Sequence, residues 1–304
     1  MYLYGLVTKD LLATCYSRRS PSLPSDSFPP YLCKRLTEDG KVPANLKDVW
    51  CGTASESLPV YTLEWKEKSI RFYDSSHSAI LASYVPINPL HIVEIDRRRL
   101  DLIQESILQM APYFTGQLDI IFDFTSTIVW LNARECGFSG AAFHELPHCT
   151  FLSDAFFVAV TPSIILAPEH RHYIIFENLY HEALHHQLSA SVMLETGGYY
   201  PNGVYYDERF YVGSRDKEWS IPNIFQAAYV YLNVLQTRIH YLRAVESKCV
   251  EIDSVRNSIE QAIIYIQEMT GILMQDKKLQ AEIQNYIIQM NANFKTMTVE
   301  YSQI

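Results

Sequence analysis

The segment His181-Glu182-Ala183-Leu184-His185 has the side chains and the spacing of a metal-binding helix. Residues four apart on a helix lie on one face, so the imidazoles of His181 and His185 are placed to hold one divalent metal ion. Glu182 lies about 100° around the helix, where a carboxylate can act as general base on metal-bound water. The H-E-x-x-H pattern therefore predicts a metal site, and any catalysis is expected there.

A second segment, His144-Glu145-Leu146-Pro147-His148, fits the same letters without the same geometry. Pro147 has no N–H to donate and is tolerated only in the first turn of a helix. His144 would then lie outside the helix, and the two rings would not share a face. We interpret this match as accidental. His186, which follows the first motif, points about 100° away from His185 and is not expected to bind the metal.

Hydrophobic periodicity places the first motif in the middle of a long helix. Pro168 is expected to open this helix, and Gly197-Gly198 to end it. A further helix over 222–245 carries a neutral polar stripe in an otherwise apolar sequence, which predicts a hydrogen-bonded pocket wall. The other predicted elements are strands at 60–65, 69–73, 118–122, 127–131 and 156–166, a helix at 92–111, a Tyr-rich loop at 199–220, and two or three helices within 250–300.

This order of elements predicts the fold class α+β. We expect a central mixed or antiparallel sheet and a C-terminal helical half that carries the HExxH helix. Residues 1–60 are expected to form an irregular N-terminal segment, because residues 17–60 are rich in Ser and Pro. No clean linker follows, so 61–304 is predicted to be a single α+β metal-binding domain.

Charge and composition disfavour several classes of partner. The net charge is -9 and the basic clusters are short, so neither nucleic acid nor an anionic membrane is an expected partner. No run of about 20 apolar residues is present to span a membrane, and the first residues do not resemble a signal peptide. The six cysteines show no zinc or redox spacing, which favours reduced thiols and a cytoplasmic location.

The chain resembles a bacterial family of HExxH-motif proteins, the iron(II)- and 2-oxoglutarate-dependent peptide hydroxylases found near ribosomally made natural products. The resemblance rests first on the run Leu179-Tyr180-His181-Glu182-Ala183-Leu184-His185-His186-Gln187-Leu188. The runs 214–222 and 227–232 look like that family's second block, in which an Arg and a Trp precede a helix. Residues 137–140 and 150–153 are also similar, so the resemblance covers roughly residues 118–245.

The resemblance implies an iron(II) site held by His181, His185 and a third ligand, with 2-oxoglutarate and oxygen at the remaining positions. Glu182 would then lie beside the ligands and would not be the base. Where family members carry a histidine near the start of the second helix, this chain has Gln226. His240 is the only histidine on that helix and lies about 21 Å further along it. The third ligand therefore stays open between Gln226, His240 and a loop residue.

The same chemistry needs a cation for the distal carboxylate of 2-oxoglutarate, and a planar guanidinium suits that task. Arg215 is the first candidate, and Arg238 on the second helix is the alternative.

The residues and the family resemblance together leave three functions, of which the oxygenase rests mainly on the resemblance. The favoured one is a metal-dependent oxygenase that uses iron(II) and 2-oxoglutarate to hydroxylate a peptide or an amino-acid-like substrate. A zinc-dependent metallohydrolase of the peptidase type is the first alternative, with Glu182 as general base. Its weakness is that the interior of the 222–245 helix offers no acidic third ligand. The last alternative is a non-catalytic scaffold with a vestigial metal site.

Overall fold

The computed structural model describes residues 61–72, 91–132, 139–142, 148–196, 208–246, 251–276 and 281–304. The chain divides into two compact units, one of Pro24–Ala190 and one of Met1–Leu23 with Ser191–Ile304. We call them the sheet unit and the helical unit and describe each by itself. The predicted irregular segment 1–60 lies outside the described residues, and the single domain over 61–304 stays a prediction.

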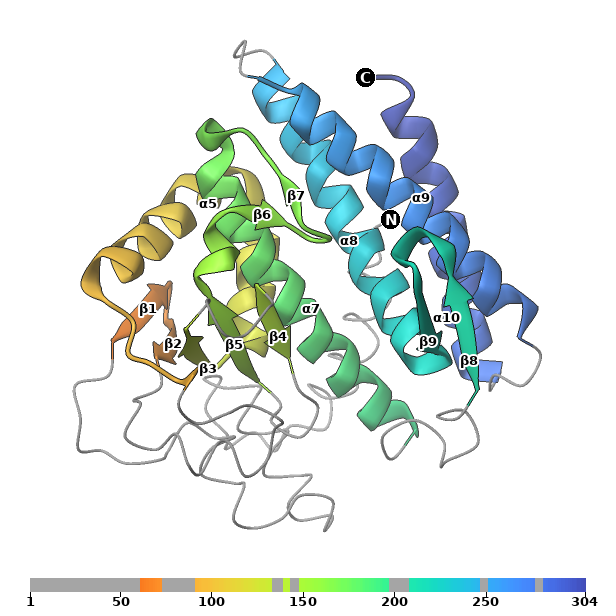
Figure 1. Ribbon diagram of the computed structural model, residues 1–304, viewed down its shortest axis with the longest axis horizontal. Helices are drawn as coiled ribbons and strands as arrows, with labels where there is room; N and C mark the ends of the chain where they lie inside the picture. Colours follow the sequence, from red (N-terminus) through yellow and green to blue (C-terminus); the bar gives the residue numbers. More distant parts are fainter. Residues whose placement is uncertain are drawn as a thin grey trace. The chain divides into compact units, whose positions relative to one another are not determined.

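The sheet unit is built on a five-stranded mixed sheet (Figure 1). Its strands are β1 (Thr62–Trp65), β2 (Lys68–Phe72), β3 (Thr127–Leu131), β4 (Gly140–Ala142) and β5 (Cys149–Ser153), in the order β1-β2-β3-β5-β4. The central strands β2, β3 and β5 are parallel, and β1 and β4 pair antiparallel at the two ends. All residues of β3 and β5 are buried, which is typical of strands covered on both faces. The α+β class and the mixed sheet are confirmed.

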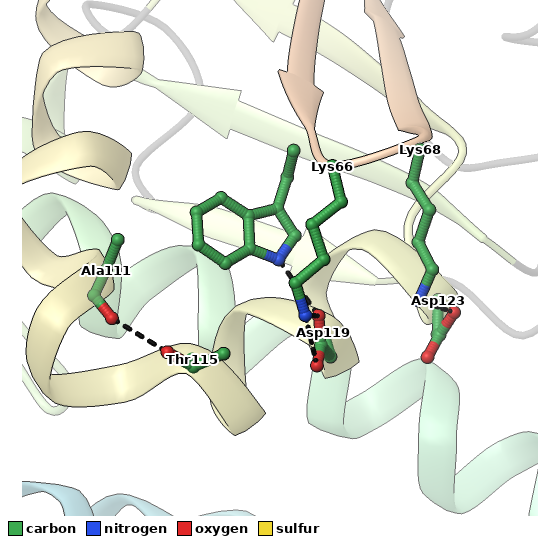
Figure 2. A network of polar contacts seen from close by, with 7 residues as sticks. Lys66, Lys68, Ala111, Thr115, Asp119 and Asp123 are labelled. Carbon is green, nitrogen blue, oxygen red and sulfur yellow. Dashed lines mark hydrogen bonds and ion pairs between the residues drawn. The ribbon is translucent and has the colours of Figure 1, made fainter.

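Helix α5 (Arg97–Phe124) is longer than the sequence indicated. Asp96 caps its start, because its carboxylate accepts a hydrogen bond from the Arg99 N–H (2.8 Å). Pro112, expected to end the helix, lies inside it, and the backbone kinks at Phe114 (φ -133°, ψ 36°). The Thr115 hydroxyl donates to the Ala111 carbonyl at this kink (2.9 Å; Figure 2).

The strand predicted at 118–122 is wrong, since these residues form the last turns of α5. Leu118, Ile120, Ile121 and Phe122 are all buried. A short apolar run that is buried on every side has no helical or strand period to read, so its sequence does not separate the two.

The β1–β2 hairpin is fastened to the second half of α5 (Figure 2). Lys66 at the turn pairs with Asp119 (2.6 Å), and the Trp65 indole N–H donates to the same carboxylate (2.9 Å). One helical turn later, Lys68 pairs with Asp123 (2.5 Å). Burial raises the pKa of Asp123, and Lys68 opposes that rise. These contacts hold the hairpin in register at one end of the sheet.

Between the sheet and the motif helix the chain makes short elements: η4 (Asp154–Phe157), β6 (Ala159–Val160), β7 (Ile164–Ile165) and η5 (Pro168–His170). The single strand predicted at 156–166 is therefore wrong, because the segment folds back as a two-stranded hairpin. Helix α7 (Arg171–Thr196) follows and contains the whole HExxH motif. The expected opening at Pro168 is confirmed as a 3₁₀ turn, while Gly197-Gly198 lies outside the described residues.

The helical unit contains a hairpin and three long helices (Figure 1). Strands β8 (Arg209–Val212) and β9 (Lys217–Ser220) flank η6 (Gly213–Arg215), so the loop predicted at 199–220 is wrong over this stretch. Helices α8 (Ile221–Glu246), α9 (Asp253–Gln275) and α10 (Ala281–Tyr301) confirm the helical C-terminal region. That this helical half carries the HExxH helix is not confirmed, since α7 is grouped with the sheet as far as Ala190.

Candidate metal centre

The rings of His181 and His185 lie next to each other on α7, the edge of one towards the face of the other. Their Nε2 atoms lie 3.3 Å apart, their ring centroids 5.0 Å apart, and their planes are inclined by 68°. Two metal–nitrogen bonds of about 2.0–2.1 Å at a tetrahedral or somewhat smaller angle place two nitrogens about 3.0–3.4 Å apart. The observed separation fits a shared metal ion, and it equally suits a hydrogen bond in which one ring N–H donates to the other ring.

One polar stripe on α7 contacts the segments that precede the helix within the sheet unit. It consists of Asn178, Glu182 and His186. The three residues are four apart and share a face. The Asn178 amide donates to the carbonyls of Phe156 (2.9 Å) and Ala159 (2.8 Å). The stripe lies about 100° around the helix from the face of His181 and His185. It therefore sets the rotation of α7, and with it the direction in which the histidine pair points.

Glu182 is buried, with 6% of its surface exposed. Its Oε1 lies against Gly140 of β4, where an added Cβ would be only 2.6 Å away. Its Oε2 is buried and has no hydrogen-bond partner among the described residues. Burial raises the pKa of this carboxyl to about 8. A cation at the histidine pair would lower that pKa, because a nearby positive charge favours the carboxylate.

His186 is fixed by β5 and by His148, the residue that precedes this strand. Its Nδ1 accepts from the His148 backbone N–H (3.2 Å), and its Nε2 contacts the Thr150 hydroxyl (3.1 Å). The imidazole rings of His148 and His186 pack with their centroids 5.9 Å apart. Burial, then the neighbouring His148 and His185, lowers the pKa of His186. These contacts with His148 and Thr150 are consistent with the expectation that His186 does not point in the same direction as His181 and His185.

His148 has a structural place that sequence reasoning missed. Its backbone is left-handed (φ 64°), so it is not part of a helix, and residues 144–147 lie outside the described residues. Its Nδ1 lies 2.9 Å from the Phe124 carbonyl, while Nε2 is buried without a hydrogen-bond partner in the described part of the chain. Burial lowers the pKa of His148 to about 4, and the bond to Phe124 opposes this. His148 is thus a neutral core histidine whose ring packs on that of His186.

The proposed third ligands lie in the other unit. Gln226 and His240 are both on α8, Gln226 half-buried and His240 exposed. Burial, and then Arg243, lowers the pKa of His240. Within the described ranges, no three His, Cys, Asp or Glu side chains are grouped to hold a metal ion. The two histidines fit two metal positions by their chemistry and separation, and the third ligand stays a prediction.

The two candidate arginines already have partners inside the helical unit. The guanidinium of Arg215 lies over the rings of Trp219 (5.5 Å) and Tyr265 (5.6 Å) and donates to the Tyr231 hydroxyl (3.0 Å). Arg238 is fully buried and donates to the Ser258 carbonyl of α9 (2.7 Å). Each side chain therefore stabilises its own unit, and a role toward 2-oxoglutarate stays a prediction.

No protein-family model matches this chain, and no curated protein is significantly similar to it.

Over the described residues, no helix is both long and apolar enough to cross a membrane. Cys149 is buried in β5 as a free thiol, and burial raises its pKa to about 12.

Proposed function

We propose that this chain is an iron(II)- and 2-oxoglutarate-dependent oxygenase that hydroxylates a peptide or an amino-acid-like substrate, as its resemblance to the HExxH hydroxylases implies. The observation that carries the proposal is the 3.3 Å separation of the His181 and His185 Nε2 atoms, which suits two ligands of one metal ion. The cytoplasmic location and the natural-product setting inferred from the sequence belong to the same proposal.

The packing of α7 supports a metal site at this pair. Metal affinity depends on ligands that are held in place before the ion arrives. Glu182 and His186, the residues that follow each histidine, are buried against β4 and β5. The helix can rotate little without losing these contacts, so the two imidazoles stay directed at one point.

Each residue then has a separate task. His181 and His185 would hold two positions on iron, and the third ligand expected from the sequence would be Gln226 or His240. When bound, iron(II) and 2-oxoglutarate supply the oxidising chemistry at open metal positions. Arg215, or Arg238 in its place, would neutralise the distal carboxylate of 2-oxoglutarate, because a planar guanidinium can bind a carboxylate through two N–H donors.

A zinc hydrolase is the second candidate, and one observation favours it. The Glu182 Oε2 atom, on the residue that follows His181, is buried without a hydrogen-bond partner among the described residues. A carboxylate in that position can accept a proton from a water molecule and act as general base.

An anaerobic metal titration separates these functions. Wild-type protein is expected to bind one iron(II) per chain and to develop a weak visible charge-transfer band when 2-oxoglutarate is added. His181→Ala should abolish both. His172→Ala is the matched control, because His172 is on the same helix, contacts Ser106 (3.0 Å) and lies outside the motif.

Other outcomes decide against the oxygenase. Tight stoichiometric zinc without the visible band would favour the hydrolase. A wild-type protein that binds neither metal, with a stability unchanged in His181→Ala, would favour the scaffold.

A further inference from the structure

Strand β4 touches the motif helix at one glycine. A Cβ added to Gly140 would lie 2.6 Å from Oε1 of Glu182, 3.1 Å from its Cδ and 3.2 Å from its Cγ. Real side chains do not approach this closely without moving. The carboxyl group of Glu182 therefore packs directly on the main chain of β4, and only a hydrogen atom fits between them.

The sheet prevents Gly140 from moving away. Gly140 is paired with Leu152 of β5, and the preceding Ser139 carbonyl accepts from the Ser153 N–H (3.0 Å). Two residues further on, Ala142 is paired with Thr150, whose hydroxyl contacts His186. The register of β4 on β5 thus places one contact on Glu182 and another on His186, one helical turn apart.

Glu182 has little room in other directions. The side chain is 6% exposed and belongs to a helix that is buried on most faces. A methyl group at position 140 would therefore turn or displace the carboxyl instead of pushing it into solvent. Because Glu182 directly follows His181 on α7, any such movement strains the helical turn that carries the histidine pair.

We infer that Gly140 is a positioning residue for Glu182, the motif residue that follows His181, because it leaves no side chain in the place that the carboxyl group occupies. This inference rests on the proposed metal site. It adds a residue from the sheet to a site that otherwise comes from helices, and it explains why the β4 position next to the motif carries no side chain.

The test uses cobalt(II) as the probe, titrated into the full chain and read from its visible absorption. Groups next to metal ligands typically change metal affinity about 10–100-fold when altered. Gly140→Ala is expected to weaken cobalt(II) binding at least about tenfold and to change the band positions. The matched control is Gly116→Ala, because an added Cβ at this exposed α5 glycine meets nothing within 4 Å. It should bind within about twofold of wild type.

Rescue distinguishes positioning from damage to the strand. Glu182→Asp shortens the side chain by one methylene, so the Gly140→Ala/Glu182→Asp double variant relieves the contact. We expect the second substitution to cost much less in the Gly140→Ala background than in wild type. The same cycle on thermal stability without added metal checks that both variants fold and that the two positions are coupled.

Three results would overturn the inference. Cobalt(II) binding by Gly140→Ala equal to wild type would do so, and so would additive effects in the double variant. Wild-type protein that binds no cobalt(II) would overturn the proposed metal site itself, and the positioning role with it. The first two outcomes leave the proposed function intact, so the failures are distinguishable.

Discussion

Helices α7 and α8 are both 26 residues long and mostly buried, but they use their polar residues differently. On α8, the Asn233 amide donates to the Tyr229 carbonyl (2.9 Å) and the Thr237 hydroxyl donates to the Asn233 carbonyl (2.9 Å). These two bonds stay within the helix, although Arg238, also on α8, donates to the Ser258 carbonyl of α9. On α7, Asn178 and His186 reach segments that precede the helix in the sequence.

This difference indicates which polar side chains can still bind a ligand. Polar groups that bond along their own helix stabilise it and have little capacity left for a ligand. Polar groups that bond to a neighbouring layer fix the helix rotation and leave another face in a defined direction. In the polar stripe predicted on α8, Asn233 is hydrogen-bonded and His240 is exposed, and the pocket wall itself stays a prediction.

The sharpest test of this comparison replaces one histidine on each helix. His185→Ala should weaken iron(II) binding by at least about a thousandfold, because it removes one of the metal ligands themselves. His240→Ala should leave binding within about tenfold if Gln226 or a loop residue is the third ligand. Anaerobic metal titration measures both. An equal loss in His240→Ala would identify His240 as the third ligand and give α8 a direct part in the site.

Arg238→Ala should be the most destabilising substitution on α8. The variant leaves a cavity and removes the donor to the Ser258 carbonyl, so the free energy of unfolding should fall by about 3 kcal/mol. Urea unfolding at neutral pH measures this loss. Metal affinity should stay unchanged if Arg238 serves only the α8–α9 packing. A loss of 2-oxoglutarate binding without loss of stability would contradict that role.

Acid should weaken the sheet unit through His148. The pKa of His148 is about 4 in the folded chain and near 6.5 when unfolded, so the unfolded state binds more protons below pH 6.5. Stability from this group is complete above pH 6.5 and is lost as the pH falls towards 4. At pH 5 the loss should reach about 2 kcal/mol. Urea unfolding of wild type and His148→Gln at several pH values tests it, and parallel pH profiles would exclude His148 as the source.

Arg215→Lys should have the smallest effect. Lysine keeps the charge but loses the planar guanidinium that lies over Trp219 and Tyr265, so stability should fall by about 1 kcal/mol. Chemical unfolding without metal measures this change. The same variant is informative with 2-oxoglutarate present. Weaker 2-oxoglutarate binding by more than the stability loss explains would place Arg215 at the cofactor.

Sequence reasoning succeeded where the signal is local. The apolar period around His181 and His185 predicted the α7 helix, and the one over 222–245 predicted α8, because a helix repeats its pattern within a few residues. It failed at 118–122 and at 209–220. In the first case uniform burial removed the period, and in the second a hairpin formed from residues with no clear alternation.

By itself the sequence determined that His181 and His185 share one helical face and that Glu182 lies about 100° around the helix from His181. Both follow from 3.6 residues per turn. Only the tertiary structure decided what surrounds them. The contacts of Glu182 with Gly140 and of His186 with Thr150 join segments far apart in the chain, through the register of β4 on β5. No local pattern encodes such contacts, because they depend on which strands become neighbours in the sheet.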